Sequence, residues 1–163
     1  MAWGEYRQLA EPRRESLMVF RYLMSLALLM VISMVDNADA AKPGPKDEDA
    51  PDEFSKTDSG LEYRILRKSD GKKPRKKDKV TVHYEGWLDD ETVFDSSYKR
   101  DETTSFPLDG VIPGWTEGLQ LVGEGGMIQL RIPSDLGYGP NGRPGTIPGG
   151  ATLHFLVELK RVH

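Results

Sequence analysis

Cysteine is absent from the 163-residue chain, and neither sign of charge dominates it. Without a thiol, the protein can form neither a disulfide bond nor a thiolate metal site. Its formal net charge is −4 at pH 7, from 22 basic and 26 acidic side chains, which is too small and too mixed to indicate a nucleic-acid-binding surface. The three histidines lie far apart in the sequence, so we expect no metal ion and no other cofactor.

Nucleotide-binding and hydrolase motifs are equally scarce. The chain has no Walker sequence and no G-x-S-x-G nucleophile motif. Residues 137–142 match G-x-G-x-x-G, but a dinucleotide site needs a helix that begins inside this motif. Pro140, Pro144 and Pro148 disfavour such a helix, so we interpret this segment as a loop.

Only one long apolar run occurs, between residues 22 and 35. It is shorter than the roughly 20 residues that a membrane-spanning helix needs. Arginines precede it and Ala-Asp-Ala follows it at 38–40, a pattern typical of a secretory signal peptide. We therefore interpret residues 1–40 as a signal peptide for export to the periplasm or the medium. The alternative is an uncleaved membrane anchor, and a start at Met18 would leave the signal complete.

Residues 41–59 differ in composition from the C-terminal part of the chain. They are rich in proline and acidic side chains, and Phe54 is their only large apolar residue. Such a segment buries too little apolar surface to offset the entropy of ordering its backbone. We therefore expect a disordered linker over residues 41–59 and one folded domain over residues 60–163.

Period-2 alternation of apolar and polar residues predicts strands throughout this domain. The clearest strand is at 79–88, where Val80, Val82 and Tyr84 alternate with polar neighbours. A hairpin turn is expected directly after it, at the acidic residues 89–91. The other predicted strands are residues 61–66, 92–95, 105–108, 126–133 and 151–162.

One helix is predicted in the domain, over residues 113–121. Pro113 suits its first turn, and Trp115, Leu119 and Val122 recur at the spacing of one buried face. Strands that follow one another without helical crossovers favour an antiparallel sheet. The expected fold class is therefore α+β, with a curved antiparallel half-barrel sheet of five to six strands wrapped around one short helix.

Aromatic side chains occur on five different predicted elements. On composition alone they would form an ordinary hydrophobic core. The sequences around them, however, resemble those of FKBP-type peptidyl-prolyl cis–trans isomerases in order and spacing. The matching segments are V-H-Y-E-G at 82–86, V-F-D-S-S at 93–97, V-I-P-G-W-T-E-G at 111–118, L-G-Y-G at 136–139, and I-P at 147–148 with A-T-L-H-F at 151–155.

The resemblance covers about residues 60–163 and implies a proline-binding pocket between the sheet and the helix. It implies that Trp115 forms the floor of this pocket, and that the amide of Ile112 and the hydroxyl of Tyr138 donate hydrogen bonds to a bound ligand. Asp95 would be the only carboxylate inside, paired with Arg100 or with Tyr138. The residues implied to act on the prolyl amide are Tyr84, Phe94, Asp95, Ile112, Trp115, Tyr138 and Phe155. Those implied to bind the rest of the substrate are Val111, Ile147, Arg143, Arg100 and Thr104.

Two of these positions depart from the family pattern. An aromatic residue is common where Thr104 stands, and its loss would open one wall of the pocket and weaken the binding of macrolides. A histidine is frequent where Arg143 stands, so the rim of the pocket is expected to be more cationic.

The resemblance implies a peptidyl-prolyl cis–trans isomerase that assists the folding of exported proteins. The alternative is a folding helper that holds proline-containing chains without turning them over. We expect proline-containing polypeptides as partners, with macrolides of the rapamycin type as further ligands. Nucleic acid is not expected to bind, contact with a membrane is expected only through an uncleaved signal segment, and the protein is expected to be a monomer.

Overall fold

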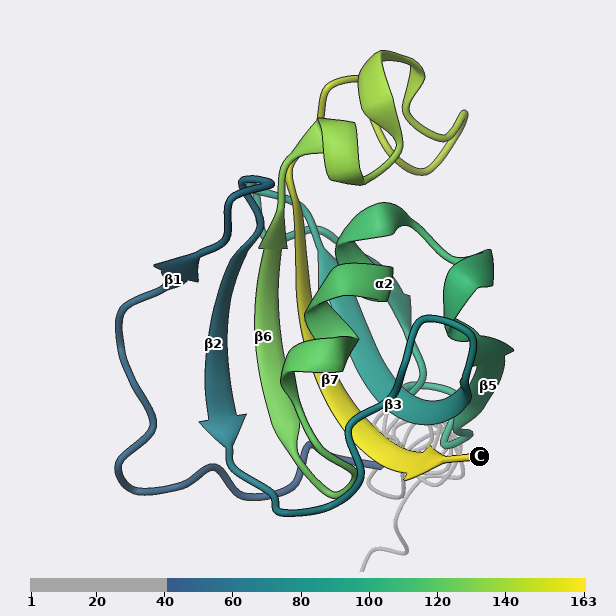
Figure 1. The fold of residues 1–163 in the computed structure, drawn as a ribbon. Coiled ribbons are helices and arrows are strands. Elements are labelled where there is room, and N and C mark those ends of the chain that lie inside the picture. Colours follow the sequence, from purple (N-terminus) through teal and green to yellow (C-terminus); the bar gives the residue numbers. More distant parts are fainter. Residues whose placement is uncertain (1–40) are drawn as a thin grey trace, which may run out of the picture. The chain divides into compact units, whose positions relative to one another are not determined.

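The strands of the described chain form one antiparallel sheet (Figure 1). The computed structural model describes residues 41–163, so the expected signal peptide lies outside the described residues. In chain order the strands are β1 (Ser55–Lys56), β2 (Glu62–Arg67), β3 (Lys79–Trp87), β4 (Val93–Ser96), β5 (Thr104–Pro107), β6 (Met127–Ile132) and β7 (Leu153–Val162). Their order in the sheet is β1-β2-β6-β7-β3-β4, and β5 pairs with the first part of β3.

The sheet curves around helix α2 (Pro113–Gly118), which continues as a 3₁₀ turn over Leu119–Leu121 (Figure 1). The remaining 3₁₀ turns are Leu108–Gly110, Ser134–Leu136 and Gly139–Asn141. The expected fold class is confirmed. The two-residue strand β1 adds a seventh strand to the expected five to six. None of the helices in residues 41–163 has the length and apolar character needed to span a membrane.

Strand β3 organises the site because it contacts three other strands. It pairs with β7 along its length, with β5 near its start, and with β4 near its end. The predicted alternation is confirmed: Val80 and Val82 are fully buried and Tyr84 is 8% exposed, so all three point to the concave face. The strand therefore leads from the closed core into the part of the concave face where the sheet is open.

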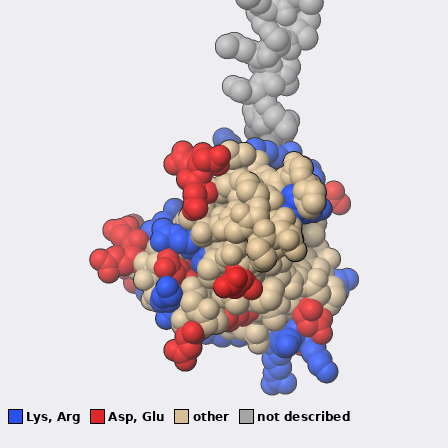
Figure 2. Space-filling model, turned by 90° about the horizontal axis from the view of Figure 1, so that it is seen from above, with Lys and Arg blue, Asp and Glu red and all other residues tan. Residues whose placement is uncertain are grey.

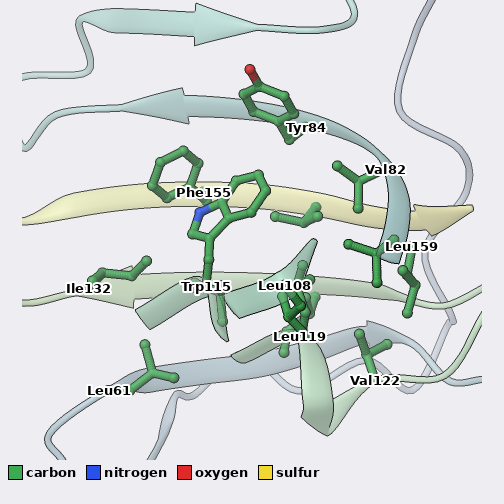
Figure 3. Packing of buried hydrophobic residues seen from close by; sticks show 14 of the residues in the cluster. Leu61, Val82, Tyr84, Leu108, Trp115, Leu119, Val122, Ile132, Phe155 and Leu159 are labelled. Carbon is green, nitrogen blue, oxygen red and sulfur yellow. The ribbon is translucent and has the colours of Figure 1, made fainter. Parts of the chain in front are cut away.

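The helix lies unusually close to β6, and two glycines allow it. A β-carbon at Gly114 would lie 2.5 Å from a methyl carbon of Ile132, and one at Gly118 would lie 2.7 Å from a methyl carbon of Leu130. Trp115 and Leu119 project from the same helix into the core (Figure 3). The close approach fixes the depth at which the Trp115 indole sits beneath the concave face.

The structure differs from the expectation of a disordered linker over residues 41–59. The backbone of this segment forms hydrogen bonds with the folded domain: Ser55 is in register with Tyr63 in the β1–β2 pair, and the Asp47 amide donates to the Leu66 carbonyl at 2.8 Å. An edge strand leaves a row of unpaired backbone groups, and these can order a chain that buries little apolar surface.

Phe54 is held in the same way, by polar rather than apolar neighbours. The guanidinium groups of Arg64 and Arg131 lie 5.0 and 4.5 Å from the centre of its ring. A cation over an aromatic face is attracted by the ring quadrupole, with about 0.5–1 kcal/mol for an exposed pair. Residues 41–59 are therefore ordered by backbone hydrogen bonds and cation–π contacts, which their amino-acid composition does not reveal.

Candidate active site

A cavity of about 740 Å³ opens on the concave face of the sheet, beside helix α2. Its walls come from four strands, the helix, the connection between β5 and α2, and the loop between β6 and β7. The lining residues are Tyr84, Phe94, Asp95, Thr104, Phe106, Gly110, Val111, Ile112, Trp115, Tyr138, Arg143, Thr146 and Phe155.

The floor and walls of this cavity are packed aromatic rings. Trp115 meets Phe155 edge to face, with ring centres 5.0 Å apart and planes at 85°, and it meets Tyr84 similarly at 5.2 Å and 84°. Phe94 packs on Phe155 at 5.5 Å, and Phe106 packs on Trp115 at 5.4 Å. Figure 3 shows Trp115 projecting from the helix toward Tyr84 and Phe155 on the sheet. Such edge-to-face pairs stabilise one arrangement of the rings, so the apolar surface is preorganised.

Asp95 forms the polar corner of the cavity, and its charge is balanced. The Tyr84 hydroxyl donates to one carboxylate oxygen at 2.5 Å, and the Arg100 guanidinium donates to the other at 2.5 Å. Arg100 also donates to the Tyr84 oxygen at 3.1 Å, which closes a three-membered network. Burial alone would raise the pKa of the Asp95 carboxyl, but the hydrogen bonds from Tyr84 and Arg100 outweigh it and hold this pKa below its ordinary value. The Asp95 carboxylate is therefore ionised near neutral pH, and both of its oxygens already accept hydrogen bonds.

Of the two partners predicted for Asp95, Arg100 and Tyr138, the structure contains only the first. Arg100 pairs with Asp95 from outside the cavity lining. The second partner is Tyr84 rather than Tyr138, because β3 and β4 are paired here while Tyr138 is on the distant loop.

Two further donors, on residues that line the cavity, have no partner in the described part of the chain. The indole nitrogen of Trp115 is buried without a hydrogen bond, and the backbone amide of Ile112 donates to none of residues 41–163. A buried donor left unpaired costs about 1–3 kcal/mol, and such groups are found at functional sites. The family resemblance implies that the Ile112 amide donates to a ligand, and this role stays a prediction.

The remaining predicted residues fall into two groups. Thr104, Val111, Tyr138 and Arg143 line the cavity as expected, whereas Ile147 is only 4% exposed and packs in the core beneath it. Phe106, Gly110 and Thr146 also line the cavity and were not predicted from the sequence. Phe106 follows Thr104 by two positions in β5, so period-2 alternation places both on one face and was the signal that could have found it.

Tyr138 lines the cavity from the loop between β6 and β7. Its side chain is among the exposed large hydrophobic groups, at 37%, and its hydroxyl bonds to no other described residue. We expect Tyr138→Phe to leave the melting temperature unchanged and to lower turnover of a proline peptide by about two- to tenfold, the equivalent of one lost hydrogen bond. Thermal unfolding and a protease-coupled assay check this, and an unfolded variant would show that the hydroxyl is structural.

The half-open sheet, its single helix and the aromatic cavity with one paired carboxylate together define a class of protein. The family model described as FKBP-type peptidyl-prolyl cis-trans isomerase matches residues 70–160. The chain therefore belongs to this family. The five sequence segments that carry the resemblance contribute most of the lining residues named above.

Individual relatives agree with this assignment. The chain is 49% identical over 117 residues to the probable FKBP-type isomerase FkpA of Neisseria meningitidis, covering 72% of this chain and 43% of that protein. It is 47% identical over 106 residues to the FKBP-type 22 kDa isomerase of Escherichia coli, covering 65% of this chain and 52% of that protein. The crystal structure of FkpA from Escherichia coli is similar, with a TM-score of 0.65, 37% identity, and coverage of 91% of this chain and 70% of that one. This chain thus spans about half the length of the curated relatives it matches.

Proposed function

We propose that the chain catalyses cis–trans isomerisation of prolyl peptide bonds, and that the aromatic cavity is where it does so. The observation that carries this proposal is the cavity itself: apolar rings around a site whose one carboxylate is already engaged by Tyr84 and Arg100. A site of this kind suits a reaction in which no covalent bond is made or broken.

The chemistry needs only a difference in solvation. A prolyl amide rotates over a barrier of about 18–20 kcal/mol, because rotation disrupts C–N resonance. The twisted amide is less charge-separated than the planar one, so an apolar pocket favours it relative to water. Selective binding of the twisted form by about 5–7 kcal/mol would accelerate rotation by roughly 10⁴–10⁵-fold.

The donors at the edge of the cavity complete this mechanism. The free amide of Ile112 and the exposed hydroxyl of Tyr138 would bind carbonyl oxygens that flank the proline, which holds the peptide while its amide turns. The paired Asp95 would orient Tyr84 and Arg100 at the polar corner rather than accept a proton. No cofactor is needed for any of these steps.

The alternative is a helper that binds proline-containing chains without turning them over, and the polar Thr104 in the cavity wall favours it over a fully enclosed aromatic pocket. A protease-coupled assay on a proline tetrapeptide separates the two. Turnover above the uncatalysed rate supports catalysis. Peptide binding by calorimetry without turnover would establish the helper instead.

The pH dependence of turnover tests the absence of proton transfer. The Asp95 carboxyl has a lowered pKa, so it stays ionised well above that value, and burial lowers the pKa of His83, which is not among the cavity residues. We therefore expect a flat profile of kcat/KM between about pH 5.5 and 8.5. Stopped-flow measurement across this range checks it, and a bell-shaped profile would contradict a mechanism without acid–base catalysis.

We propose that the protein works outside the cytoplasm, where it acts on exported chains as they fold. The support is the sequence pattern of residues 1–40, with its arginines, apolar run and Ala-Asp-Ala. Macrolides of the rapamycin type would compete with clients for the cavity, with affinity weakened by Thr104. A monomeric state and the absence of nucleic-acid binding belong to the same proposal.

A further inference from the structure

Arg143 stands on a rigid turn at the cavity. Its backbone amide donates to the Ile147 carbonyl at 2.8 Å, and the Ile147 amide donates back to the Arg143 carbonyl at 2.8 Å. Pro144 and Gly145 make the turn between them, and Gly145 has a φ of +78°, which glycine adopts without strain. The start of the arginine side chain is therefore fixed although the residue belongs to a long loop.

The charge of Arg143 is not balanced within the described chain. Its side chain lines the cavity and is exposed, yet it makes no hydrogen bond or ion pair with any of residues 41–163. The other charges at the site, Asp95 and Arg100, neutralise one another at 2.5 Å. Arg143 is thus the one unpaired charge among the cavity residues of the described structure, and the site as a whole carries an excess of one positive charge.

The surroundings of Arg143 suit an anionic group. Thr146, its neighbour in the turn, also lines the cavity and adds a hydroxyl that can donate a hydrogen bond. Figure 2 shows the face of the molecule that carries this loop, where uncharged atoms cover much of the surface, an acidic group lies near the centre, and the other acidic and basic side chains lie toward the sides. A cation beside an apolar, low-dielectric surface attracts a counter-charge more strongly than one in open water.

We propose that Arg143 forms a carboxylate subsite, which makes the protein selective for client chains with Asp or Glu beside the proline. The inference rests on the proposed function, because it describes how a client enters the same cavity. The guanidinium would bind the client carboxylate through two parallel N–H···O hydrogen bonds while the proline ring occupies the aromatic floor. Arg143 determines specificity here and takes no part in the rotation itself.

The test compares peptides that differ only beside the proline. Two tetrapeptide series carry Glu, Gln or Lys immediately before the proline in one and immediately after it in the other. We expect kcat/KM for Glu to exceed that for Gln by about two- to fivefold in one series, and that for Lys by more, as for an exposed ion pair. The preference should appear mainly in KM and should shrink in 1 M salt, where the screening length is about 3 Å.

Substitution of Arg143 assigns the preference to this residue. Arg143→Gln should bring the Glu-to-Gln ratio to about one, and Arg143→Glu should invert the order of Glu and Lys. Arg161→Gln is the matched control, because Arg161 is also exposed and lies six residues beyond Phe155 on β7, roughly 20 Å along the strand. This control should keep the full preference for Glu.

The outcomes distinguish failure of the proposed function from failure of the carboxylate subsite. Absence of turnover with every peptide would overturn the proposed function. Turnover with no preference for Glu in either series, or with a preference that survives in Arg143→Gln, would overturn the carboxylate subsite alone. A preference that Arg161→Gln abolishes equally would show that the overall charge, not the subsite, is responsible.

Discussion

Replacing Glu158 by alanine is expected to lower the free energy of unfolding by about 3–5 kcal/mol, because it leaves a half-buried cation without its counter-charge. The Glu158 side chain is only 4% exposed, and it accepts from the Arg67 guanidinium at 2.9 Å. It also accepts from the Tyr98 hydroxyl at 2.9 Å and from the Gly44 amide at 2.7 Å. One carboxylate thus joins β7, β2, the β4–β5 connection and the segment before β1.

Urea denaturation followed by tryptophan fluorescence measures this loss, with Glu158→Gln as the matched variant. Glutamine keeps the shape and one acceptor oxygen but not the charge, so it should lose less stability than alanine. Arg67→Met/Glu158→Leu tests the cause. The apolar pair removes the buried Arg67 charge and leaves only the half-exposed Lys160, 3.4 Å from Glu158, without its partner, so part of the loss should be recovered. A loss below about 1 kcal/mol in Glu158→Ala would show that solvent replaces the network.

The same carboxylate makes stability depend on pH in the acid range. Burial by itself would raise the pKa of Glu158, but the Gly44 amide, Arg67 and Tyr98 outweigh it and lower this pKa from 4.5 to about 2. A group whose pKa is lower in the folded state contributes stability that is present above its unfolded value and is lost as the pH falls toward its folded value. About 3 kcal/mol should therefore disappear between roughly pH 5 and pH 2, and this loss should be absent in Glu158→Gln. Denaturation curves for both proteins across this range check the difference.

Glu158 also explains where prediction from sequence fell short. Alternation along residues 151–162 puts Leu153, Phe155, Val157 and Leu159 on the core face, where the structure has them, and puts Glu158 on the opposite face, where a side chain would be expected to meet solvent. It is buried because the segment before β1 covers it, and that segment was expected to be disordered. Both differences have one cause: composition and alternation describe apolar burial, whereas this segment is ordered by hydrogen bonds to partners as far as 114 positions away in the sequence.

The fold and the aromatic cavity were predictable for the opposite reason. Strand alternation and the helical spacing of Trp115 and Leu119 are local patterns, and the family segments place most of the cavity residues in order. The partner of Asp95 was not local. Tyr84 and Asp95 meet only because the β3–β4 register sets Gly86 opposite Asp95, with a shift between Gly86 and Trp87. A sequence without its register cannot distinguish Tyr84 from Tyr138 as the partner.

Gly86 lies on β3 next to two aromatic walls of the cavity, Phe94 and Phe155, and its lack of a side chain leaves room for both rings. It pairs with Asp95 on β4 and with Phe155 on β7. A β-carbon at this position would lie 2.6 Å from a ring carbon of Phe155 and 2.7 Å from one of Phe94. Carbon atoms in contact stay about 3.5–4.0 Å apart, so both rings would have to move by the better part of 1 Å.

We therefore expect Gly86→Ala to reduce both stability and activity. Overpacking of this kind costs about 1–3 kcal/mol, and a displacement of about 1 Å in a preorganised site can lower the rate by up to 10²-fold. We expect kcat/KM for a proline tetrapeptide to fall by about tenfold or more, while circular dichroism stays that of a folded sheet. Denaturation and protease-coupled turnover on the same preparation give the two quantities.

The double variant Gly86→Ala/Phe94→Leu identifies the clash as the cause. Leucine at 94 removes the ring edge that the new methyl group meets, so the two substitutions together should cost less stability than the sum of the single ones. Phe94→Leu alone provides the reference for the loss of one aromatic wall. Additive stability losses would mean that the rings do not meet the new methyl group. Unchanged turnover in Gly86→Ala would mean that the spacing of Phe94 and Phe155 does not control the rotation of the prolyl bond.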